Sequence, residues 1–238
     1  MKLSPIGKVH TRDGCNCETA MGQERIKEHR NSGATMKTAE NTRMQELIRA
    51  RIQRDIEIKQ LLLASDAYHD LVAHVATQIV KSLRAGGKVI FFGNGGSAAN
   101  AQHLAAEFTG RYLKERRALP ALALHANTSS LTAISNDYGF EFVFARQIEA
   151  LGKEGDVAVG ISTSGNSPNV LRALEAAKSK NIYTVALAGL SGGKMKQLAD
   201  RTICIPTDET PRIQECHILT GHLICEIVEE TVFERPQG

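Results

Sequence analysis

Val89-Ile90-Phe91-Phe92 leads directly into Gly93-Asn94-Gly95-Gly96-Ser97, so that a short apolar run ends in a glycine-rich turn. The same order recurs where Val157-Ala158-Val159-Gly160-Ile161 leads into Ser162-Thr163-Ser164-Gly165-Asn166-Ser167. A helix-forming stretch follows each turn. Such a turn presents backbone N–H groups and hydroxyls at the positive end of a helix dipole, which suits a phosphate group. The pair predicts an open α/β sheet that holds a phosphorylated small molecule at the carboxyl ends of its strands.

Strands and helices alternate along the rest of the chain. Val157–Ile161 and Thr184–Leu187 are apolar on both faces, which is typical of a parallel sheet covered by helices on each side. The pattern predicts strands at 88–92, 120–125, 156–161, 182–188 and 202–206. It predicts helices at 97–110, 128–136, 140–151, 167–180, 193–199 and 211–234. The expected fold is a doubly wound, parallel five-stranded sheet flanked by helices.

Two further helices are expected before the first strand. Apolar residues recur at near-helical spacing from Thr42 to Leu63 and from Ala67 to Leu83. These helices belong to no strand–helix–strand crossover, so their apolar faces are expected to pack against another subunit. Residues 1–38 are polar and show no sustained periodicity, which predicts a disordered leader or extension before a single domain over 39–238.

Composition excludes several classes of protein. The 238 residues are 42% hydrophobic and 23% charged, and the net charge of +3 is too small to indicate a nucleic-acid partner. No apolar stretch reaches the roughly 20 residues that a membrane span needs. The N-terminus lacks the apolar core of a signal peptide. The five cysteines suggest neither a disulfide framework nor a zinc knuckle, so we expect a reducing, cytoplasmic compartment.

The first turn has a rival interpretation, because Gly93–Ala98 also fits the G-x-G-x-x-A dinucleotide fingerprint. That fingerprint requires an acidic residue at the end of the next strand, where this chain has His125-Ala126-Asn127-Thr128. Either turn could also serve only as a helix cap, since Ser97 and Ser167 are good N-cap residues. Capping alone does not require three hydroxyl residues at 162–164, so ligand binding is favoured.

A second group of polar residues lies on two helices. His103 and Glu107 are four residues apart and share one helix face, which matches a half-site for a divalent metal such as zinc. Taken alone, such a pair is more often a surface hydrogen bond. On the last helix, Gln214 and His222 are about 12 Å apart along the axis and about 80° apart around it, so both could face one cleft. His217 is interpreted as a packed or surface histidine.

In this order, the motifs resemble the phosphoheptose isomerase family of the sugar isomerase (SIS) superfamily. The resemblance covers about residues 40–235 and rests on Gly93–Glu107, Thr109–Tyr112, Asn136–Phe140, Gly155–Val157, Gly160–Ser167, Arg212–Glu215 and His222. It implies a SIS fold, a homotetramer with active sites at subunit interfaces, and conversion of D-sedoheptulose 7-phosphate to D-glycero-D-manno-heptose 7-phosphate. That product feeds heptose synthesis for cell-surface polysaccharide.

The resemblance also implies site residues and one Zn²⁺ per subunit. The implied zinc ligands are His103, Glu107, Gln214 and His222. The implied substrate contacts are Asn94, Gly95, Gly96, Ser97, Glu107, Arg111, Asn136, Asp137, Ser162, Thr163, Ser164, Ser167 and Gln214. One position departs from the family pattern, because Pro211 stands where an Asp precedes the Arg-Ile-Gln-Glu run.

Aldose–ketose exchange through an enediol needs a base over C1 and C2 and an acid near the two oxygens. We assign Glu107 as the carbon base and His222 as the acid/base at oxygen. Coordination would lower the basicity of Glu107, and the sequence leaves open which role dominates. Two alternatives remain: a non-catalytic, tetrameric SIS protein that binds the replication initiator DnaA, and another SIS enzyme or sugar-phosphate sensor. The presence of both Glu107 and His222 favours the isomerase.

Overall fold

The computed structural model describes residues 23–233, with side chains from Glu40 onward. The chain divides into two compact units, residues 1–53 and 54–238. Helix α1 (Gln23–Leu63) crosses this boundary and begins well before the expected residue 42. Gln, Glu, Arg, Lys and Ala recur in its first half and favour a helix even without an apolar stripe. The leader expected over 1–38 therefore lies partly outside the described residues, and the domain limit at residue 39 stays a prediction.

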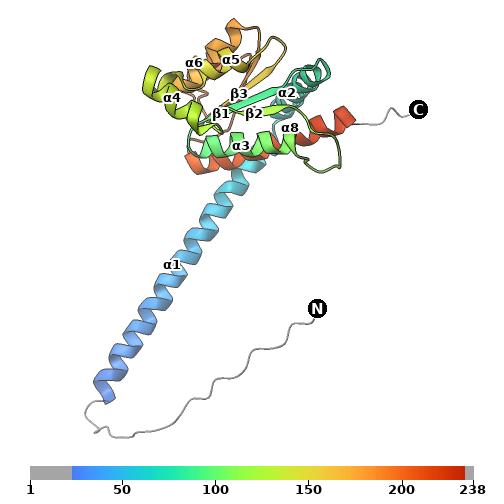
Figure 1. Ribbon diagram of the computed structural model, residues 1–238. Coiled ribbons are helices and arrows are strands. Elements are labelled where there is room, and N and C mark those ends of the chain that lie inside the picture. Colours follow the sequence, from blue (N-terminus) through green and yellow to red (C-terminus); the bar gives the residue numbers. More distant parts are fainter. Residues whose placement is uncertain (1–22, 234–238) are drawn as a thin grey trace, which may run out of the picture. The chain divides into compact units, whose positions relative to one another are not determined.

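The second unit is built on a parallel sheet of five strands (Figure 1). The strands are β1 (Val89–Gly93), β2 (Ala121–Ala123), β3 (Val157–Ser162), β4 (Tyr183–Ala188) and β5 (Arg201–Cys204), in the spatial order β2-β1-β3-β4-β5. The predicted doubly wound sheet is confirmed. The two edge strands, β2 and β5, are shorter than expected. Strand order reverses between β1 and β3, which is where open α/β sheets bind their ligands.

Helices cover both faces of the sheet. Alternate residues of β1 point to opposite faces: Phe91 joins a core with α2 (Asp66–Arg84), α3 (Gly96–Thr109) and α8 (Thr210–Phe233). Phe92 joins the opposite core, with α5 (Ala145–Leu151), α6 (Pro168–Ser179) and α7 (Met195–Leu198). Helix α4 (Thr128–Tyr138) lies near α5 and α6. None of the helices in the described part of the chain combines the length and the apolar character that a bilayer crossing requires.

One predicted helix is broken in the structure. The segment expected as a single helix over 140–151 forms a 3-10 turn, η1 (Phe140–Phe142), followed by α5. The side chains of Val143 and Phe144 are both buried in the core that α5, α6 and α7 form with one face of the sheet. The chain turns at these two residues, which places both side chains in the core.

Candidate active site

The two glycine-containing turns lie side by side at the point where the strand order reverses. Gly93 at the end of β1 pairs with Ile161 near the end of β3. The amide side chains of Asn94 and Asn169 exchange two hydrogen bonds, each of 2.9 Å. Asn169 is buried. A polar residue in the first turn of a helix carries no distinct sequence signal, so this partner of Asn94 was not predicted. This amide pair joins the first turn to the start of α6.

The second turn forms a cluster of serine hydroxyls. Ser162 Oγ lies 2.9 Å from Ser167 Oγ and 3.4 Å from Ser164 Oγ. Ser167 occupies the N-cap position of α6, yet its side chain makes no capping hydrogen bond. Its hydroxyl is instead part of the cluster, so capping does not explain why a serine stands there. The arrangement offers several hydroxyls, at the start of a helix, to one anionic group.

Backbone contacts hold this turn in place. Gly165 adopts φ +66°, and a Cβ at this position would lie 2.2 Å from the carbonyl oxygen of Gly192. Met195 N donates to Gly165 O at 3.0 Å, and Lys194 N donates to the side-chain oxygen of Asn166, also at 3.0 Å. The segment before α7 is therefore packed against the serine turn, and only glycine fits at position 165.

The first turn differs from the sequence-based expectation at Ser97. Helix α3 begins at Gly96 with Gly95, at φ +55°, as its N-cap. Ser97 lies inside the first helical turn and is buried, so it is not the N-cap residue that the alternative interpretation of this turn requires. The side chain of Gln214 lies over Gly96, where a Cβ would be 2.5 Å from Gln214 Nε2. The glycine thus leaves room for the Gln214 amide at the mouth of this turn.

Helices α3 and α8 run in the same direction and pack closely. Gly96 lies against Gln214, and further along the two helices Leu104 lies against Gly221. A Cβ on Gly221 would lie 2.4 Å from Leu104 Cδ2, so the absence of a side chain allows the close approach. Asn100 Nδ2 donates to the carbonyl oxygen of Gln214 at 3.0 Å and links the same two helices.

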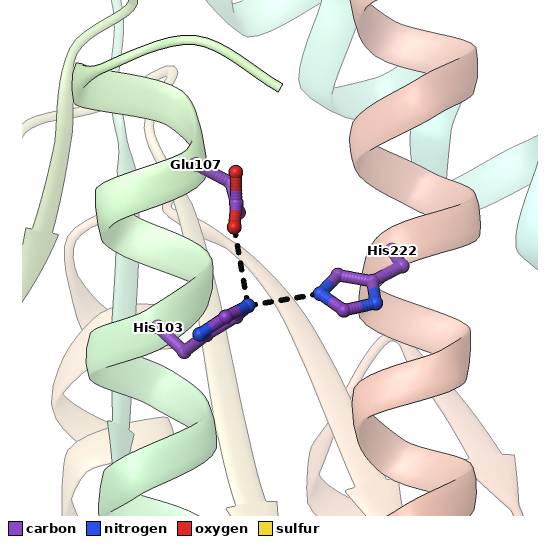
Figure 2. Close-up of side chains that lie close together, drawn as sticks. All are labelled: His103, Glu107 and His222. Atoms are coloured by element: carbon purple, nitrogen blue, oxygen red, sulfur yellow. Dashed lines mark hydrogen bonds and ion pairs between the residues drawn. The ribbon is translucent and has the colours of Figure 1, made fainter. Parts of the chain in front are cut away.

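His103, Glu107 and His222 converge between these helices (Figure 2). His103 Nε2 lies 3.1 Å from Glu107 Oε1 and 3.0 Å from His222 Nε2. One donor atom from each of the three residues lies within 4.8 Å of the others. Two imidazoles and one carboxylate form a donor set that suits a catalytic zinc ion. The structure therefore brings together three of the four zinc ligands that the resemblance implies.

The environment of His222 favours its neutral form. Burial lowers the pKa of this imidazole, repulsion from His103 lowers it further, and Glu107 opposes both effects. A neutral imidazole keeps a lone pair for a metal ion or a proton. Only one of two facing Nε2 atoms can carry the proton of a hydrogen bond, so at least one of the two histidines presents a lone pair toward the centre of the cluster.

Other predicted site residues lie elsewhere in the subunit. Asp137 accepts a hydrogen bond from Asn136 Nδ2 at 2.9 Å and lines a cavity of about 780 Å³ with Gln102, between α3, β2, α4 and α5. Gln102 is on a different side of α3 from His103 and Glu107, so this cavity and the histidine cluster flank the same helix. Arg111 is exposed and lies 3.8 Å from the carboxylate of Glu115. Within the described subunit, these residues are not adjacent to the cluster.

His217 is a packed histidine. It is completely buried, and its Nε2 lies 3.1 Å from the carbonyl oxygen of Ala188. Burial lowers the pKa of its imidazole to about 4, so the side chain is neutral at physiological pH. This side chain belongs to the core between α8 and β4.

The chain is similar to proteins of one known family. The family described as "SIS domain" matches residues 57–189. A phosphoheptose isomerase from Aneurinibacillus thermoaerophilus is 50% identical over 190 residues, which cover 80% of this chain and 96% of the relative. The chain belongs to the phosphoheptose isomerase family. Another member, from Aquifex aeolicus, is 52% identical over 192 residues, which cover 81% of this chain and 100% of the relative.

Solved structures support the same assignment. The phosphoheptose isomerase GmhA from Neisseria gonorrhoeae superposes with a TM-score of 0.74 at 43% identity, covering 79% of this chain and 99% of that chain. The resemblance stated from the sequence motifs is thereby confirmed. Membership of the phosphoheptose isomerase family also disfavours the reading as a non-catalytic protein that binds a replication initiator.

Proposed function

We propose that this protein is an aldose–ketose isomerase that converts D-sedoheptulose 7-phosphate to D-glycero-D-manno-heptose 7-phosphate. The observation that carries the proposal is the convergence of His103, Glu107 and His222 from two helices, in a chain half identical to phosphoheptose isomerases. The product would enter the synthesis of precursors for a cell-surface polysaccharide. A cytoplasmic location and the lack of nucleic-acid and membrane partners stay predictions.

The serine turn is proposed to bind the phosphate group. Ser162, Ser164 and Ser167 already share hydrogen bonds, so their hydroxyls are gathered before a ligand arrives. The N-terminus of α6 adds a favourable dipole. Binding at the phosphate, remote from the reacting carbons, supplies energy that positions the carbonyl end of the sugar. The remaining predicted contacts, at Asn94–Ser97, Thr163, Arg111, Asn136, Asp137 and Gln214, belong to the same proposal.

Zinc is the proposed metal, because the donor atoms of His103, Glu107 and His222 fit it. When bound, the ion would polarise the substrate carbonyl and stabilise negative charge on its oxygen. Gln214 stays a predicted fourth ligand. It lies two turns of α8 before His222, about 12 Å along the helix, so joining the other three would require a long reach or a second subunit.

Glu107 and His222 are proposed to move the protons. Glu107 takes a proton from C1 of the ketose while His222 gives one to the oxygen on C2, which forms an enediol. Glu107 then returns a proton to C2 and His222 takes one from the oxygen on C1, which leaves the aldose. A Glu107 carboxylate held by a metal would be a weaker base, and a His222 nitrogen held by a metal could not carry a proton, so the two proposed roles of each residue compete.

The homotetramer also stays a proposal. Leu47, Ile48 and Ile52 on α1 are each more than half exposed, which is unusual for three large apolar side chains so close in sequence. Burial against another subunit would remove them from water. Sedimentation equilibrium would give the number of subunits.

Turnover measured with and without zinc tests the proposed function. We expect the purified protein to form the heptose 7-phosphate from sedoheptulose 7-phosphate, to lose this activity on treatment with a chelator, and to regain it when zinc is added. A protein that converts no sugar phosphate after zinc loading would contradict the proposal. A thermal-shift panel of C6 and C7 sugar phosphates then separates another SIS enzyme or sensor from a phosphoheptose isomerase.

A further inference from the structure

The segment that follows α3 is anchored to α8 by one buried carboxylate. Glu229 accepts backbone hydrogen bonds from Tyr112 N at 3.1 Å, Leu113 N at 2.7 Å and Lys114 N at 2.8 Å. Its fourth hydrogen bond comes from Arg116 Nε at 2.6 Å. A carboxylate offers about four acceptor sites, so Glu229 is fully used by this one segment. Residues 110–117 are therefore fixed relative to α8 rather than forming a free loop.

Arg116 extends this anchor to the end of α3. Its guanidinium donates to the carbonyl oxygens of Phe108 at 3.0 Å, Gly110 at 3.1 Å and Glu107 at 2.8 Å. The last carbonyls of a helix have no partner within the helix, so Arg116 supplies what the end of α3 lacks. The side chains of Arg116 and Glu229 are each only 3% exposed. The pair thus connects the backbone of Glu107 to α8.

Tyr112 belongs to this anchored segment and also contacts the histidine cluster. Its ring centroid lies 5.6 Å from that of His222, with the two planes tilted by 33°. The centroid of His103 lies 5.1 Å from that of His222. The imidazole of His222 thus contacts both an aromatic ring and the histidine with which it is proposed to bind zinc. Glu229 accepts from Tyr112 N and so fixes the backbone from which this ring projects.

We infer that Tyr112 is a positioning residue for His222, and that the buried Glu229–Arg116 pair holds Tyr112 in place. This inference rests on the proposed function in that it assigns the cluster a role in zinc binding and proton transfer. The Tyr112 ring limits the rotation of the His222 imidazole, so that its Nε2 stays directed at His103 and Glu107. Partners that orient metal-binding histidines contribute to affinity although they do not touch the metal.

Variants of Tyr112 test the inference through two readouts other than turnover. We expect Tyr112→Ala and Tyr112→Leu to lower the zinc affinity about 10- to 100-fold. In the metal-free protein, we expect both to shift the imidazole NMR signals of His222 and His103. Tyr112→Phe keeps the ring and should restore both readouts to those of the parent protein. Glu229→Gln loses the charge that satisfies four donors. This variant should lower the zinc affinity and shift the histidine signals, as Tyr112→Ala does.

Tyr183→Leu is the matched control. The ring centroid of Tyr183, on β4, lies 6.4 Å from that of His74, so the variant removes a tyrosine ring beside a histidine outside the segment 110–117. Its zinc affinity and its His222 and His103 signals should match those of the parent. Parental zinc affinity and histidine signals in folded Tyr112→Ala or Tyr112→Leu would overturn the inference. A parent without isomerase activity, combined with the expected spectral shifts, would instead refute the proposed function and leave Tyr112 as the residue that positions His222.

Discussion

His103 Nε2 and His222 Nε2 lie 3.0 Å apart, although 119 residues separate them in the chain. The two atoms meet because α3 and α8 run in the same direction and touch at Leu104 and Gly221, the residues next to the two histidines. Glu107, one turn further along α3, lies within reach of the same point.

Glu107→Gln should abolish isomerisation while sugar-phosphate binding survives. The amide has nearly the same shape as the carboxylate but cannot take the C1 proton, so we expect kcat to fall about 100-fold or more. Turnover and a binding isotherm for sedoheptulose 7-phosphate measure the two effects separately. Glu149→Gln removes an exposed carboxylate on α5 and should leave both unchanged. Near-normal turnover in Glu107→Gln would remove this residue from the mechanism.

Ser167→Ala should raise KM about 10-fold or more for the phosphorylated substrate, since a hydrogen bond to a charged group contributes about 1.5–3 kcal/mol. The free energy of unfolding should change little, because the Ser167 hydroxyl makes no capping hydrogen bond. Ser65→Ala is the opposite case: Ser65 accepts from Tyr68 N at 3.2 Å and caps α2. We expect that variant to lose about 1 kcal/mol of stability with an unchanged KM. Equal losses of stability in the two variants would indicate that Ser167 is a structural cap after all.

Gly221→Ala should push α3 and α8 apart. The added Cβ meets the side chain of Leu104, which is only 1% exposed and has little room to move. Overpacking of this kind costs about 1–3 kcal/mol, which exceeds the gain of about 1 kcal/mol from replacing a helical glycine. The zinc affinity should fall as well, because His103 and His222 separate.

A double-mutant cycle checks the cause of this effect. In the Leu104→Ala background the clash is absent, so Gly221→Ala should cost less free energy of unfolding than in the parent protein. An equal loss of unfolding free energy in both backgrounds would show that the strain does not arise between these two residues.

His217 should make stability depend on pH. Its folded-state pKa is lowered from 6.5 to about 4, so the unfolded state binds the proton more readily. The contribution of the neutral side chain is therefore fully present above about pH 6.5 and is lost as the pH falls toward 4. It amounts to about 3 kcal/mol.

Urea unfolding of the parent and of His217→Gln between pH 4 and pH 7 measures this contribution. The glutamine amide can still donate to the carbonyl oxygen of Ala188 but does not titrate in this range. We expect the difference in unfolding free energy between the two proteins to change with pH by a few kcal/mol. A difference that stays constant would show that His217 is not the titrating group.

Local sequence was sufficient to place most of the elements. Apolar runs that lead into a glycine-containing turn mark β1 and β3, and the helical repeat places His103 and Glu107 on one face of α3. The prediction was less accurate where packing decides the conformation. The chain turns at Val143 and Phe144 because both side chains enter the core, and no local signal distinguishes this from a continuous helix. Ser97 lies within α3 because glycine, with its positive φ, takes the N-cap position.

The sequence by itself determined the alternating order of strands and helices, the two glycine-containing turns and the family of this protein, because each depends on residues near one another in the chain. The resemblance implied that His222 joins His103 and Glu107, and the tertiary structure brings the three together. Only that structure decided that Tyr112, anchored by Glu229 and Arg116, lies against His222. Only the structure showed that Asp137 lines a cavity on a different side of α3 from the histidine cluster. These relationships depend on how closely two helices pack, and that distance is set by side chains such as Leu104 and by the absence of one at Gly221.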